Sequence, residues 1–109
     1  MSSRKRYKVI YDQHHILCDK GNFFLIPIDI FNYDLKPAAL AVYMVLSRYS
    51  DSNGESYPSR NTIAENCNVS VDTVDKAMKE LKKAGLVEVT PQFSEGAQKS
   101  NLYKLIRTN

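Results

Sequence analysis

The chain has 109 residues, the length of one domain with one modest hydrophobic core. Its 43% hydrophobic and 25% charged residues exclude wholesale disorder and fibrous repeats. The net charge of +3 is unevenly spread, because residues 1–10 carry four positive charges and no negative ones. The longest apolar run, nine residues from Ala38 to Leu46, is too short for a membrane span of about 20 residues. With no apolar signal-peptide core after the N-terminal cations, we expect a cytoplasmic protein with no membrane partner.

Residues 1–6 are predicted to form a flexible basic arm, and residues 7–109 a single domain. Basic arms elsewhere enter a minor groove, but a solvated tail explains this composition equally well. Residues 7–11 are rich in β-formers. Gly and Asn in the Asp19–Asn22 stretch favour a turn, so we expect residues 16–18 and 23–26 to pair as an extra N-terminal β-hairpin. Pro27 disfavours a continuing central strand.

The first strong helix is predicted from Pro37, which suits a first-turn position, to Tyr49. Residues 39, 42, 43, 46 and 49 form one apolar stripe, but the opposite side is apolar too. A helix that is apolar all round is either central in the domain or contacts a partner chain. Residues 50–54 are a loop.

Two short helices joined by about three residues follow. Ser59 and Ser70 are placed as N-caps, and the first of the two helices ends near Asn68. Gly85 suits the position just after the second helix. Inward-facing positions are expected at Ile63, Ala64 and Cys67 in the first helix, and at Val74, Ala77, Met78 and Leu81 in the second.

A strand pattern over residues 86–90, a polar stretch over 91–99 and a returning strand over 100–106 predict a β-hairpin with a long polar tip. Two helices in this spacing form a helix-turn-helix, and the hairpin adds a wing. The predicted fold is therefore α+β: a winged helix-turn-helix with a three-helix core, a C-terminal β-hairpin wing at 86–107 and the extra N-terminal β-hairpin.

The sequence resembles a known family in these segments. Residues 57–65 (YPSRNTIAE) and 68–87 (NVSVDTVDKAMKELKKAGLV) are similar to the helix-turn-helix and first wing strand of bacterial winged-helix regulators, including the GntR type. Residues 24–31 (FLIPIDIF), followed by an apolar helix, are still more similar to plasmid and phage replication initiators and related mobile-element proteins. The resemblance covers about residues 23–107.

This resemblance implies a sequence-specific double-stranded DNA-binding protein of a plasmid, phage or other mobile element. It would act in replication or transfer, or in transcriptional regulation, by docking the second helix in the major groove. A homodimer and a replication or transfer protein partner are further expectations. The alternative is a protein-interaction adaptor with little DNA affinity, favoured by the small net charge and the acidic residues of the second helix.

Candidate DNA contacts follow from this docking geometry. Basic side chains and a helix N-terminus can hold phosphates, and residues facing the groove can contact base edges. The candidates are Arg4, Lys5 and Arg6 in the arm, Ser59, Arg60 and Asn61 at the first of the paired helices, Ser70, Asp72, Thr73, Lys76 and Lys79 in the second, and Gln98, Lys99 and Ser100 near the wing tip.

The second helix departs from many relatives, which carry basic residues where this chain has Val71 and Asp75. One hypothesis is that Asp72 or Asp75 accepts a hydrogen bond from a cytosine amino group. The other is that they form i,i+4 pairs with Lys76 and Lys79 and only stabilise the helix.

Other chemistries find little support in the sequence. His14 and His15 are the only histidines, and together with Cys18 they do not complete a tetrahedral metal set. No Gly-rich phosphate loop is present, and nothing completes a Cys–His catalytic arrangement. We therefore expect no metal, no cofactor and no enzymatic activity.

Overall fold

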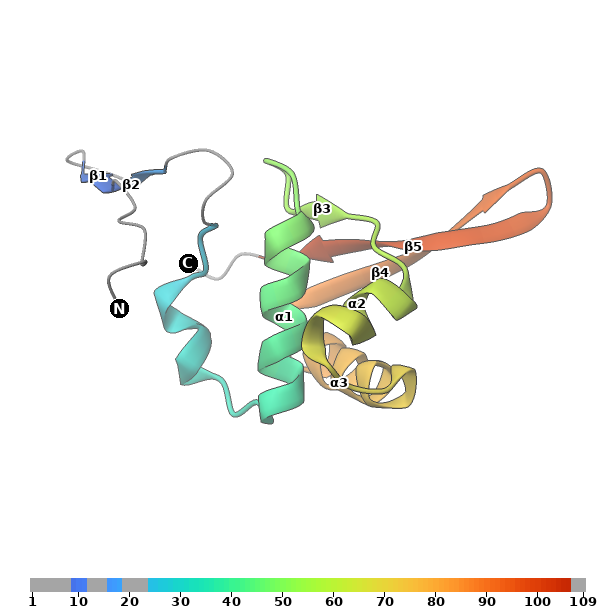
Figure 1. Cartoon of the computed structure of the whole chain (residues 1–109), viewed down its shortest axis with the longest axis horizontal. Helices are drawn as coiled ribbons and strands as arrows, with labels where there is room; N and C mark the ends of the chain where they lie inside the picture. The colour runs from blue at the N-terminus through green and yellow to red at the C-terminus, as the bar shows by residue number, and fades with distance from the viewer. Residues whose placement is uncertain (1–8, 12–15, 19–23, 107–109) are drawn as a thin grey trace, which may run out of the picture.

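The structure, a computed structural model, describes residues 9–11, 16–18 and 24–106 of the chain. Three α-helices pack together, a three-stranded antiparallel sheet lies beside them, and its last two strands project as a wing (Figure 1). The predicted winged helix-turn-helix is confirmed. The elements are β1 (Val9–Tyr11), β2 (Ile16–Cys18), the 3-10 helix η1 (Ile28–Asn32), α1 (Pro37–Tyr49), β3 (Glu55–Ser56), α2 (Arg60–Cys67), α3 (Val71–Lys83), β4 (Val87–Ser94) and β5 (Ala97–Leu105).

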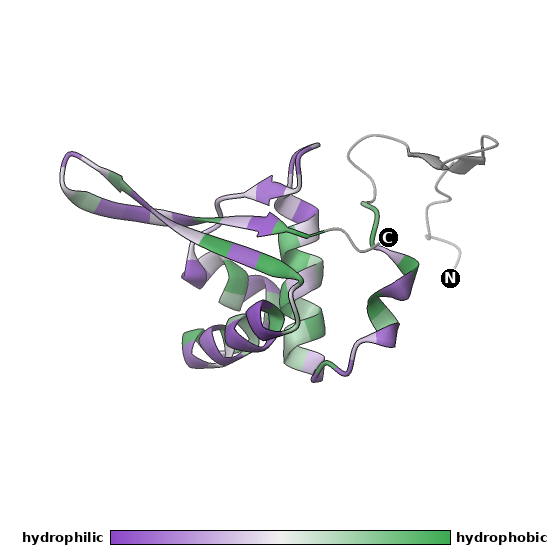
Figure 2. Ribbon diagram, turned by 180° about the vertical axis from the view of Figure 1, so that it is seen from behind, coloured by the Kyte–Doolittle hydropathy of each residue, from purple (hydrophilic) through white to green (hydrophobic). Residues whose placement is uncertain are grey.

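Helix α1 lies at the centre of the domain. It packs against α2, α3, β3 and β5, which explains why its sequence is apolar on more than one side. Figure 2 shows the apolar residues of α1 along its length. The predicted stripe is buried except for Tyr49, which is 41% exposed at the end of the helix. The buried hydrophobic residues of α1 are Ala39, Val42, Tyr43, Val45 and Leu46.

The helix-turn-helix follows the sequence closely. Ser59 and Ser70 cap α2 and α3, as predicted. Asn68 ends α2 in the left-handed conformation at φ 57°, and three residues separate the two helices. The four predicted inward positions of α3, which are Val74, Ala77, Met78 and Leu81, are all buried. Of those predicted in α2, Ile63 and Ala64 are buried and Cys67 is half-buried.

The N-terminal β-hairpin differs from the one predicted. Strand β2 pairs antiparallel with β1, with Val9 opposite Cys18, and residues 24–27 form no strand. The β-forming run before β2 supplied the partner, while the apolar run after it serves another purpose, because Ile26 packs against the core. The turn expected at Asp19–Asn22 and the basic arm at residues 1–6 lie outside the described residues.

The prediction of a long polar loop at the tip of the wing is wrong. Strand β4 continues to Ser94 and β5 begins at Ala97, so a two-residue turn at Glu95 and Gly96 joins them. Both turn residues have positive φ, 54° and 80°, which suits the twist of a tight hairpin. Pro91, which cannot donate to the ladder, sits at a register shift between Thr90 and Gln92. Residues 91–99 resembled a loop in the sequence because both faces of the outer wing are largely exposed, so its strands lack an apolar alternation.

Strand β3 was not predicted, because two residues carry no usable pattern. Glu55 and Ser56 pair with Lys104 and Tyr103, which places β5 in the middle of the sheet. The preceding loop closes onto β5 through a hydrogen bond from the Leu105 N–H to the carbonyl oxygen of Gly54 at 2.8 Å.

No helix in the part of the chain that the structure describes is both long and apolar enough to cross a membrane.

Replacing Gly54 tests how closely the loop before β3 approaches β5. Gly54 has φ +79°, and an added Cβ would lie 3.2 Å from the Leu105 backbone oxygen. Gly96 has φ +80° but open space around it, so it is the matched control. We expect Gly54→Ala to lower the free energy of unfolding by about 2–3 kcal/mol and Gly96→Ala by about 1 kcal/mol, measured by urea denaturation. Equal losses would contradict the close approach of Gly54 to β5.

Candidate nucleic-acid interface

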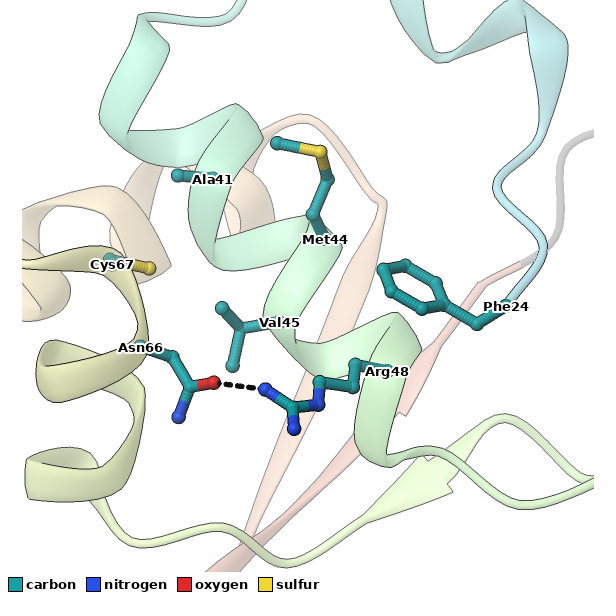
Figure 3. Close-up of a pocket in the computed structure, with 7 residues that line it drawn as sticks. All are labelled: Phe24, Ala41, Met44, Val45, Arg48, Asn66 and Cys67. Carbon is teal, nitrogen blue, oxygen red and sulfur yellow. Dashed lines mark hydrogen bonds between the residues drawn. The ribbon is translucent and has the colours of Figure 1, made fainter. Parts of the chain in front are cut away.

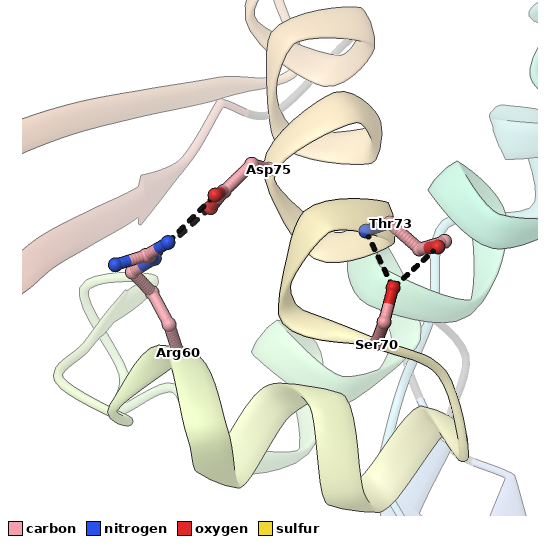
Figure 4. A network of polar contacts seen from close by, with 4 residues as sticks. All are labelled: Arg60, Ser70, Thr73 and Asp75. Carbon is pink, nitrogen blue, oxygen red and sulfur yellow. Dashed lines mark hydrogen bonds and ion pairs between the residues drawn. The ribbon is translucent and has the colours of Figure 1, made fainter.

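Helices α2 and α3 begin with the same Ser-x-x-Thr device. Ser59 Oγ accepts the Thr62 N–H at 3.0 Å, and Ser70 Oγ accepts the Thr73 N–H at 3.1 Å. The two hydroxyls of each pair also hydrogen-bond, at 2.9 Å for Ser59 and Thr62 and at 3.0 Å for Ser70 and Thr73. Figure 4 shows the pair at the start of α3. The hydroxyl of Thr73, a candidate DNA contact, therefore takes part in the cap. Sequence reasoning missed Thr62, although its spacing from Ser59 repeats that of Thr73 from Ser70.

The exposed face of α3 carries the candidate groove contacts. Asp72, Lys76 and Lys79 are exposed and follow the i, i+4, i+7 spacing of one helix face. They lie opposite the buried stripe that packs on α1, so the packing of α3 fixes which side chains solvent can reach. No ion pair joins Asp72 to Lys76 among the described residues, so that predicted pair does not form.

Asp75 pairs with Arg60 rather than with Lys79, which corrects the predicted i,i+4 pair. The Arg60 Nε donates to one Asp75 oxygen at 3.0 Å, and Nη2 donates to the other at 2.6 Å (Figure 4). Bidentate pairs of this kind fix orientation as well as adding energy. Both side chains stay accessible, at 53% and 42% relative exposure. The hydrogen bond and charge of Asp75 raise the pKa of Arg60, so the guanidinium remains cationic.

The Arg60–Asp75 pair lies where α2, α3 and the base of the wing meet. Burial raises the pKa of the Tyr103 hydroxyl on β5. The charge of Arg60 lowers this pKa and the charge of Asp75 raises it, so both side chains act on the hydroxyl. The nearby Tyr103 hydroxyl therefore stays neutral beside the pair. The Arg60–Asp75 contact joins two consecutive helices, so spacing within one helix gives no signal for it, and sequence reasoning missed it.

The remaining candidates are spread along the same domain. Asn61 is exposed in the first turn of α2. Gln98, Lys99 and Ser100 are exposed on β5 rather than in a loop, and Gln98 Nε2 donates to Asn101 Oδ1 at 3.3 Å. Phe93, opposite Gln98 in the wing, is 67% exposed and was not among the candidates. Arg4, Lys5 and Arg6 lie outside the described residues.

A pocket of about 270 Å³ opens on another surface, between α1 and the end of α2 (Figure 3). Arg48 Nη1 donates to Asn66 Oδ1 at 2.7 Å along its edge. No residue of α3 or the wing lines it, so it is separate from the candidate DNA contacts. Its lining residues are Phe24, Ala41, Met44, Val45, Arg48, Asn66 and Cys67.

Metal ligands do not gather in the part of the chain that the structure describes. No group of three or more His, Cys, Asp or Glu residues there could hold an ion. Burial raises the pKa of the Cys67 thiol, which disfavours the reactive thiolate. His14, His15 and the side chain of Cys18 lie outside the described residues.

Comparison with known families gives the same assignment as the geometry. Residues 33–87, half of the chain, match the family model of the helix-turn-helix domain. The chain belongs to the helix-turn-helix domain family. The match runs from the segment before α1 to the first residue of β4, and it includes both capped helices. Helix-turn-helix domains bind DNA, so DNA is the partner that this membership supports. No curated protein matches the sequence.

The cap of α3 can be tested by stability. Ser70→Ala removes the acceptor of the Thr73 N–H and should lower the free energy of unfolding by about 1 kcal/mol. Ser100→Ala makes the same chemical change on the exposed face of the wing and should change it by less than about 0.5 kcal/mol. Urea denaturation monitored by circular dichroism measures both. Equal effects would contradict the capping role of Ser70.

Proposed function

We propose that this helix-turn-helix protein binds double-stranded DNA sequence-specifically by placing α3 in the major groove. The observation that carries the proposal is the division of α3 into two faces. One face is buried against the core, and the other presents Lys76, Lys79 and the capped N-terminal turn to solvent. An α-helix fits the major groove, and its N-terminal residues then meet base edges.

Phosphate contacts would hold α3 in register. Ser59 and Asn61 are exposed at the N-terminus of α2, and Lys99 is exposed on the projecting wing. Backbone N–H groups at a helix N-terminus and a lysine on a wing suit a phosphate backbone, which positions the protein without carrying sequence information. Gln98 and Ser100 would contact the backbone beside Lys99, and the basic Arg4–Arg6 arm an adjacent minor groove.

The biological role follows from the resemblance to replication initiators and mobile-element proteins. We propose that the protein serves a plasmid, phage or other mobile element in the cytoplasm, in replication or transfer, or in transcriptional regulation. A homodimer would place two copies of α3 on half-sites about one helical turn apart. A replication or transfer protein would be a further partner.

A second candidate function is protein interaction without strong DNA binding. The observation that favours it is the exposed apolar surface of η1, where Ile28 is 93% and Phe31 is 75% exposed. Exposed apolar patches on folded domains mark interaction sites for other proteins. Such an adaptor would keep a protein partner and show little DNA affinity even at low salt.

DNA binding can be tested by fluorescence anisotropy on duplexes from the protein's own genetic neighbourhood, beside scrambled duplexes, at several salt concentrations. Lys76→Ala and Lys79→Ala should each weaken binding. Each should also reduce the slope of log affinity against log salt by about 1 if the lysine contacts a phosphate.

Lys104→Ala is the matched control. Lys104 is exposed on β5, and because its neighbour Tyr103 faces the core, it lies on the outer face of the sheet. It should leave the salt slope nearly unchanged. Weak binding that does not distinguish native from scrambled duplexes would overturn the proposal, and so would equal effects of all three substitutions.

A further inference from the structure

Asp75 is an acidic residue beside the DNA-facing surface of a helix that should approach phosphates. It lies one turn after Asp72 and one turn before Lys79, and its side chain is 42% exposed. A carboxylate near phosphates is unfavourable because like charges repel. Both of its oxygens accept hydrogen bonds from Arg60, so the carboxylate acts together with the arginine.

The pairing geometry leaves one edge of the guanidinium unused. A guanidinium carries five N–H donors, and Asp75 takes one from Nε and one from Nη2. The opposite end of the group still has two parallel donors, one on Nη1 and one on Nη2. This edge fits a ligand with two adjacent acceptors, such as the O6 and N7 atoms of guanine or two phosphate oxygens.

Charge favours the guanine over the phosphate. Arg60 and Asp75 together are nearly neutral, so the pair gains little from a phosphate, which its own carboxylate would repel. Guanine O6 and N7 are uncharged, and they lie in the major groove where α3 is proposed to dock.

We propose that Arg60, oriented by Asp75, recognises one guanine in the major groove, and that Asp75 is a positioning residue for sequence recognition. This inference rests on the proposed DNA-binding function. It also explains an arginine that comes from α2 and is held by α3: the pair ties the two helices together while keeping half of the arginine accessible.

The test is selection from a random duplex library, followed by affinity measurements on the selected site and on its single-base variants. The wild type should select a site with a guanine at one position. Asp75→Asn should lower the preference for that guanine by roughly tenfold. It should also raise the affinity for random duplexes, because it removes a negative charge. A purely structural role would not separate these two effects.

Two variants serve as controls. Glu65→Gln makes the same kind of charge change on α2, at an exposed residue outside the candidate DNA contacts, and should keep the guanine preference. Arg60→Lys keeps the charge but loses the paired donors, so it should lose the preference at the same base pair.

A probe on the DNA keeps the test independent of variant folding. Replacing the selected guanine by 7-deazaguanine removes the N7 acceptor, and it should weaken the wild-type protein but not Arg60→Lys. The inference is overturned if Asp75→Asn and Glu65→Gln give the same profile. It is also overturned if Arg60→Lys weakens binding to all sequences equally, which would indicate a phosphate contact. A wild-type protein that selects no site would overturn the proposed function, and this inference with it.

Discussion

The packing of α3 against α1 is the constraint on which the rest of the structure depends. Four apolar residues of α3 are buried in the core, and full burial of a side chain such as Leu81 stabilises a fold by about 1.5–3 kcal/mol. Because side chains project from all sides of a helix, burial of this stripe leaves the opposite face to solvent. The candidate groove contacts Asp72, Lys76 and Lys79 lie on that face. The core therefore selects which side chains can meet DNA.

Polar contacts between elements then fix how the helices are oriented. The carboxylate of Glu80 on α3 accepts the backbone N–H of Lys36 at 2.8 Å, just before the first turn of α1. A negative charge at that position also suits the dipole of α1. Arg60 and Asp75 join α2 to α3 at the base of the wing. The Glu80 contact holds the C-terminal part of α3 at the start of α1, and the Arg60–Asp75 pair holds the start of α2 against α3.

The sequence predicted the features that depend on neighbouring residues. The caps at Ser59 and Ser70 and the buried stripe of α3 are local, because spacing within one helix determines them. The features that it missed depend on distant residues or on two-residue elements. Strand β3 exists only because β5 offers a partner, and the Arg60 contact joins residues fifteen positions apart. The tight wing turn could not be recognised in the sequence, because both faces of a projecting hairpin can be polar and its strands then show no apolar alternation.

The N-terminal turns of α2 and α3 and the wing are the proposed DNA-binding surface. Backbone amide chemical shifts, measured by nuclear magnetic resonance during titration with a selected duplex, would map this surface residue by residue. We expect the largest changes in residues 59–62 and 70–79 and in the outer part of the wing, residues 92–100. Changes confined to η1 and to the pocket between α1 and α2, with α3 unaffected, would contradict this assignment of the surface.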